Sequence, residues 1–94
     1  MKATIVGLVT PHVLRVMDIA KQAESGANVD WHLRDAVART VADLGQQFNA
    51  VELLSAYVHG LETAAREVPP AQRAYAGALQ AAAAVAARER DARD

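Results

Sequence analysis

One apolar stripe through the middle of the chain constrains its fold more than any other feature. Between residues 33 and 68, apolar side chains recur at spacings of three or four residues without a slip. Residues three and four apart are neighbours on a helix surface, so this spacing predicts α-helix. The stripe consists of Leu33, Val37, Val41, Leu44, Phe48, Val51, Leu54, Val58, Leu61, Ala65 and Val68.

The phase of the stripe continues through Gly45 and Asn49, where a turn between two helices would have no reason to preserve it. We therefore expect one long helix over about residues 30–67, either straight or bent near residues 45–49. Two local signals oppose this. A glycine costs about 1 kcal/mol inside a helix, and Asn49-Ala50-Val51-Glu52 could form a capping box for a new helix. An unbroken helix would span roughly 57 Å.

Proline and glycine positions predict a shorter helix on each side of the long one. Pro11 is favoured at the first position of a helix, where no N–H is needed, and Gly26 is typical of the residue after a helix end. They predict a helix over about residues 11–25. Two prolines at 69–70 end the long helix and begin an alanine-rich one over about 70–90. We expect a single all-α domain, a small helical bundle.

The ends of the chain are expected to lie outside this bundle. Residues 3–9 form an apolar arm that the pattern assigns neither to a strand nor to a helical turn, and residues 88–94 form a charged tail that should fray. The N-terminal apolar run lacks a following small-residue cleavage site, and no stretch reaches the roughly 18 apolar residues of a membrane span. We expect a soluble protein of the cytoplasm.

The core of such a bundle is thin. Alanine accounts for 22 of the 49 apolar residues, which leaves 27 large apolar side chains. The two shorter helices would each cover half of the long one, so every cross-section would be two helices thick and leave apolar faces uncovered. A second copy of the chain would complete four-helix cross-sections. We therefore expect a homodimer.

The stripe and one tryptophan supply the predicted partner-binding residues. Trp31 stands at the start of the long helix, where a half-exposed indole could anchor an interface. The alternative, which we favour at this position, is that Trp31 pins the preceding turn to the first helix. The predicted partner-binding set is Trp31, Val37, Leu44, Val51, Val58 and Leu61.

Composition and spacing exclude several function classes. The chain has 10 basic and 11 acidic residues, and neither half has the basic surplus that binding to phosphates or anionic membranes needs. It has no cysteine, its three histidines are far apart, and His32 with Asp35 makes only two candidate metal ligands on one helix face. No nucleophile-elbow, P-loop or dinucleotide-binding motif is present. We expect no catalytic residue, no metal and no cofactor.

Two functional hypotheses follow. The first is a non-enzymatic protein–protein interaction module (an adaptor, chaperone, inhibitor or assembly factor) that binds itself and another protein. The alternative is a DNA-binding regulator, because residues 41–45 with Phe48 and Val51 resemble a helix-turn-helix motif. The segment that would read DNA, residues 46–57, contains Glu52 and no arginine or lysine, so the usual donors to bases and phosphates are missing.

Overall fold

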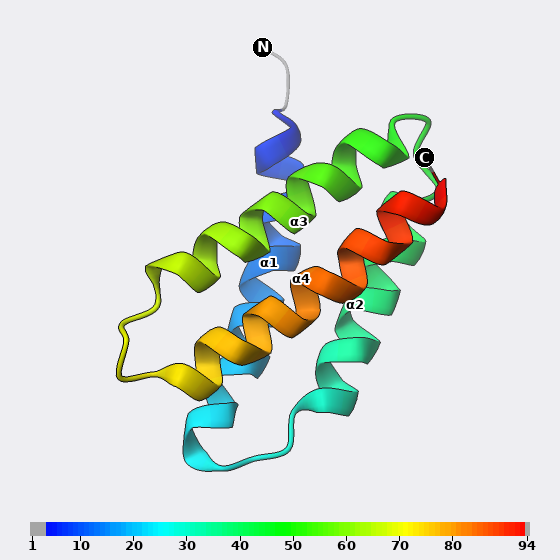
Figure 1. Ribbon diagram of the computed structural model, residues 1–94. Coiled ribbons are helices and arrows are strands. Elements are labelled where there is room, and N and C mark those ends of the chain that lie inside the picture. The colour runs from blue at the N-terminus through cyan, green and yellow to red at the C-terminus, as the bar shows by residue number, and fades with distance from the viewer. Residues whose placement is uncertain (1–3, 94) are drawn as a thin grey trace.

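Four α-helices make up most of the chain in the computed structural model, which describes residues 4–93. They are α1 (Ile5–Lys21), α2 (Asp30–Leu44), α3 (Ala50–Glu67) and α4 (Arg73–Arg93), with a short 3₁₀ helix, η1 (Gln22–Ser25), after α1. α4 lies between α2 and α3, and α1 crosses behind them (Figure 1). The described residues contain no strand, which confirms the predicted all-α bundle.

The core lies between α1 and the layer formed by the other three helices. The radius of gyration is 12.9 Å, close to the roughly 12 Å of a compact domain of this length. One chain therefore closes a core of its own. Its buried apolar residues are Val9, Val16, Ala20, Val29, Leu33, Ala36, Val37, Val41, Leu44, Leu53, Leu54, Tyr57, Val58, Leu61, Ala65, Tyr75, Leu79, Ala82, Ala83 and Ala86.

The predicted long helix is wrong, because the chain reverses between α2 and α3. An unbroken helix over 30–67 would span roughly 57 Å, whereas the longest dimension of the molecule is 39 Å. Gly45 ends α2, and its N–H donates to the Val41 carbonyl at 2.8 Å. The reversal brings both halves of the stripe to one core, so a single chain buries what a straight helix would leave exposed. Phe48 lies in the turn and is fully exposed.

The first helix begins earlier than predicted. Thr4 caps it, accepting a 2.9 Å hydrogen bond from the Gly7 N–H at its side-chain oxygen, and Pro11 lies inside the helix. The predicted arm is therefore helical from Ile5 onward, while Ala3 lies outside the described residues. The extra turns place Val9 in the core with the rest of the inner face of α1, and this burial compensates for the N–H that proline lacks.

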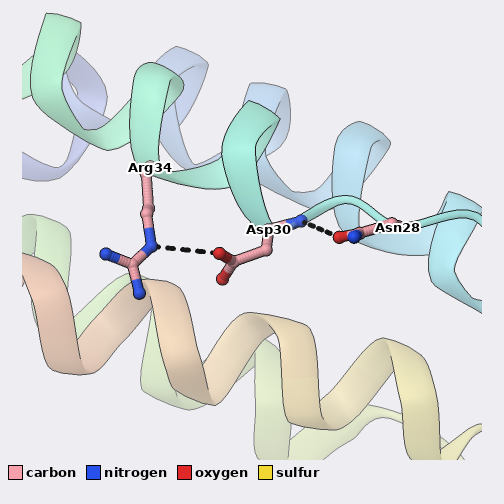
Figure 2. A network of polar contacts seen from close by, with 3 residues as sticks. All are labelled: Asn28, Asp30 and Arg34. Atoms are coloured by element: carbon pink, nitrogen blue, oxygen red, sulfur yellow. Dashed lines mark hydrogen bonds and ion pairs between the residues drawn. The ribbon is translucent and has the colours of Figure 1, made fainter.

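The connection from α1 to α2 follows its sequence signals. Gly26 adopts a left-handed conformation with φ of 88°, which confirms the predicted stop, since glycine has no Cβ to oppose it. The Asn28 side-chain oxygen accepts a 3.2 Å hydrogen bond from the Asp30 N–H at the start of α2 (Figure 2). Asp30 also pairs with Arg34 one turn along, at 3.2 Å between exposed side chains.

The last helix starts later and ends later than predicted. Residues 69–72 form a turn, and α4 begins at Arg73, where the Glu24 carboxylate accepts a 2.8 Å hydrogen bond from the Tyr75 N–H. The residues expected to fray are helical up to Arg93, and Asp94 lies outside the described residues. Alanines dominate the buried face of α4, which allows its backbone to approach α3 closely.

Candidate interaction surface

The predicted partner-binding set divides into core and surface. Val37, Leu44, Val58 and Leu61 are all at most 6% exposed. They hold the chain's own helices together and are not accessible to a partner. The faces that suggested a second copy are covered by the chain itself, because the stripe folds back on its own second half.

The other two members of the set remain accessible. Val51 is half-buried on the first turn of α3, and Trp31 is 68% exposed at the start of α2. The indole stands edge-on to the neighbouring His32 ring, with 5.3 Å between ring centroids. The predicted role of Trp31 in pinning the turn to α1 is therefore wrong, since a side chain in that role would be covered.

The front half of α1 exposes three large apolar side chains. Val6, Leu8 and Leu14 are 68%, 50% and 51% exposed, and the chain has no charged residue from Ile5 to Leu14. Thr10, also exposed, donates its hydroxyl to the Val6 carbonyl at 2.7 Å. That hydroxyl is therefore already bonded within the helix. The first turns of α1 extend past α3 at one end of the bundle (Figure 1).

A groove runs beside this region, where α1 crosses α3. It contains a small hollow of about 100 Å³, and a wider one of about 540 Å³ that reaches the end of α3. The two helices approach closely at Gly60, where a Cβ would lie 2.9 Å from a methyl carbon of Val13. The lining of the small hollow is apolar apart from its rim and consists of Val6, Val9, Thr10, Val13, Ala56, His59 and Gly60.

Two further grooves have charged rims. Between α2 and α4, a hollow of about 260 Å³ has a floor of valine, leucine and alanine, with Arg88 and the Asp30–Arg34 pair at its edge. Figure 2 shows that pair beside α4. Between α1 and α2, the walls carry charges of both signs, and Asp35 pairs with Arg39 at 3.0 Å. His32 and Asp35 both line this second groove. Among residues 4–93 no three His, Asp or Glu side chains gather as metal ligands would.

One polar cluster lies inside the bundle, where α1, α2 and α3 meet. The Thr40 hydroxyl lies 3.2 Å from Nδ1 of His12, and the Tyr57 ring stands edge-on to the same imidazole at 6.5 Å between centroids. Burial raises the pKa of Tyr57. The nearby Thr40 hydroxyl and the positive charge of Arg15 lower it, but by less than burial raises it. Within the described part of the chain, the Tyr57 hydroxyl makes no well-formed hydrogen bond. Thr40 and Tyr57 are buried, whereas His12 is half-buried and borders a hollow of about 270 Å³ beside Leu44 and Leu53.

Sequence reasoning missed Leu14 and the isolated Phe48 as surface residues, and it treated the front of α1 as an arm of undefined structure. The ten residues from 5 to 14 contain no charged residue, but residues 74–87 are also uncharged, so the sequence alone does not mark the front of α1 as exposed. Comparison with known protein families, curated protein sequences and solved structures finds no match. None of the helices in the described region has the length and apolar character needed to cross a membrane.

Proposed function

We propose that the protein is a non-enzymatic protein–protein interaction module that acts as a homodimer, in the cytoplasm, through the outer side of α1. The single observation that carries this proposal is the uncharged and exposed front half of α1. A helix that is apolar on all sides is normally covered. Here one chain closes its own core, so the apolar side chains of α1 that remain exposed are available to a partner.

The mechanism is burial of apolar helix surface without covalent chemistry. Val6 and Leu14 would supply the apolar area, and the groove between α1 and α3 would receive side chains of a partner helix. Leu8 lies on another side of α1, at the hollow that Asp43 and Leu44 also line. This moves the contact surface from the central stripe, which the core uses, to α1. Trp31 and Phe48 are separate exposed points at which another protein could dock on the dimer.

The DNA-binding alternative gains no support from the geometry. In a helix-turn-helix motif the two helices pack against each other, whereas α4 lies between α2 and α3 (Figure 1). The first turn of α3, which would enter the major groove, carries Glu52 and no cation.

Light scattering after size exclusion tests the proposal, over a hundredfold range of protein concentration. The chain is 10.0 kDa, so we expect a dimer of about twice that mass for the native sequence. Val6→Asp should shift the equilibrium to monomer with the helical circular dichroism unchanged, since an acidic residue is favourable in the first turn of a helix. A monomer at every concentration would contradict the homodimer. A shift of duplex DNA at low salt would favour the alternative.

A matched control places the same charge elsewhere. Ala38 is exposed on α2 and lines none of the grooves beside α1 described above. Ala38→Asp should leave the mass distribution of the native protein unchanged. If both aspartate variants weaken the dimer equally, the effect is one of net charge and not of the α1 surface.

A further inference from the structure

We infer that the hollow between α2 and α4 binds a small apolar carboxylate, with the apolar body on the floor of the hollow and the carboxylate between Arg34 and Arg88. This inference goes beyond the proposed function, because it concerns a different face of the bundle from the exposed side of α1. It follows from the floor of the hollow, from the charges at its edge and from its size.

The floor of the hollow is apolar and belongs to the core. Leu33 and Val37 of α2 and Ala82 of α4 are at most 5% exposed, and Val85 is half-buried beside them. α4 places alanine at three of its five lining positions, so no large side chain fills the space between the helices. An apolar group that entered the hollow would be removed from water together with this floor, which is favourable.

The edge of the hollow is positively charged. Two arginines, Arg34 and Arg88, and one aspartate, Asp30, line it, which gives a net charge of +1. The linings of the other four hollows described above are neutral or negative when histidine is counted as neutral. A small molecule with an apolar body and one negative charge therefore matches this hollow better than it matches the others.

Both arginines have N–H groups available to a carboxylate. Arg34 pairs with Asp30 through Nε alone, at 3.2 Å, and Figure 2 shows its guanidinium directed from α2 toward α4. In the described part of the chain no carboxylate pairs with Arg88, and its acidic neighbours Glu89 and Asp91 do not line the hollow. A carboxylate is planar and can accept two parallel N–H groups of a guanidinium, so it suits this edge better than a neutral polar group does.

The volume limits the ligand to a small molecule. An apolar cavity of about 150 Å³ is enough to hold benzene, whereas sites for drug-sized ligands usually measure about 300–1,000 Å³. The hollow measures about 260 Å³, so it accommodates one ring with a short side chain and is too small for a long acyl chain. The compound 3-phenylpropionate has this size, an apolar ring and one carboxylate, and it serves as the probe.

Amide NMR spectra of the full chain, titrated with 3-phenylpropionate, test the inference. We expect saturable shifts at Leu33, Val37 and Ala82, with a dissociation constant of roughly 1 mM for a ligand of about ten non-hydrogen atoms. The uncharged 3-phenylpropanamide should bind roughly fivefold more weakly, the effect of one exposed ion pair. Equal affinity for the two compounds, or no saturable shift at these positions, overturns the inference. Tighter binding of phenyl phosphate overturns the choice of a carboxylate.

Two variants and a matched control locate the site. Arg88→Gln should weaken binding roughly fivefold. Ala81→Leu should abolish binding, because it fills the hollow with a side chain of the protein itself. Both positions are exposed, so helical circular dichroism should not change. Arg73→Gln removes the same charge at an exposed position at the start of α4, outside the hollow, and should leave binding unchanged.

The pattern among these variants decides the result. Equal weakening by Arg88→Gln and Arg73→Gln would show a response to net charge and would overturn the site. Undiminished binding by Ala81→Leu would place the ligand elsewhere and would overturn it as well. Neither result bears on the homodimer, which is measured without ligand by its mass.

Discussion

α1 and α3 are both rich in aliphatic residues, but they use them differently. α3 places Leu53, Leu54 and Leu61 on one buried face, and its opposite face carries charged residues such as Glu62 and Arg66. The front of α1 has apolar residues on all sides and no charge. The difference shows two outcomes for apolar residues on a helix. Those on a single face close the core, and those on further faces remain exposed on the surface.

The largest expected effect contrasts one leucine from each helix. Leu61→Ala removes a side chain that is 0% exposed and should lower the free energy of unfolding by about 2–5 kcal/mol. Leu14→Ala should change it by less than about 0.5 kcal/mol in dilute protein, as is usual for exposed positions. Urea denaturation of both variants measures the contrast. Equal losses of unfolding free energy in the two variants would mean that Leu14 is packed in the core as Leu61 is.

A second contrast concerns the crossing of the two helices. Gly60→Ala places a methyl group 2.9 Å from Val13 and should destabilise by up to about 2 kcal/mol, since overpacking outweighs the better helix propensity. Gly77→Ala, on α4, meets nothing within 4 Å and should stabilise by about 0.4–1 kcal/mol. Thermal melts of the pair report the sign of each change. Stabilisation by both would show that α1 does not cross α3 closely at Gly60.

The buried face of α3 contains one polar exception, the Tyr57 hydroxyl. Removing it in Tyr57→Phe should stabilise the fold by about 1 kcal/mol, because a buried hydroxyl without a well-formed hydrogen bond is costly. The pKa of Tyr57 is raised in the fold from the ordinary 10.0. Above pH 10 the unfolded chain therefore loses its proton first, so stability should fall as pH rises.

Denaturant unfolding between pH 8 and 11 checks the sign of this dependence. Burial also raises the pKa of Tyr75 in the fold, so Tyr75 accounts for part of the alkaline loss. Tyr57→Phe should make the loss smaller but not abolish it. An unchanged alkaline slope in Tyr57→Phe would place the Tyr57 hydroxyl in contact with water.

The smallest expected effect concerns how the exposed part of α1 is held. Thr4→Ala removes the side-chain oxygen that accepts the Gly7 N–H at 2.9 Å and should cost about 1 kcal/mol. The loss should be local, because the front of α1 extends beyond α3. Hydrogen exchange should quicken at residues 7–10 and remain unchanged in α3. Faster exchange in α3 would show that the two helices unfold together.

The helical class, the Gly26 stop and the core stripe were predictable because each has a local cause. The reversal at residues 45–49 was not, since α2 and α3 each keep their own three-and-four spacing and the five residues between them happen to continue its phase. Gly45 was the local signal that correctly indicated the end of a helix. Its penalty of about 1 kcal/mol is small beside the apolar area that the reversal buries.

The contact surface could be predicted only in part, because burial is a property of the whole fold. The phase of Val58 and Leu61 shows that they face something, but it does not distinguish another helix of the same chain from a second chain. The uncharged stretch that ends at Leu14 is informative only together with the fold, because the fold shows which of its apolar residues are exposed. Trp31 shows the reverse error: its large ring suggested burial, yet the start of α2 leaves it in solvent.

The hydrogen bond from the Tyr75 N–H to Glu24 also joins the start of α4 to a segment far away in the sequence. The acceptor that would usually come from a residue next to the helix start comes from 51 positions earlier in the chain. One N–H in the first turn of α4 is therefore satisfied only when η1 and α4 lie together in the folded chain. Loss of this contact would therefore weaken the start of α4 and its packing on η1 together.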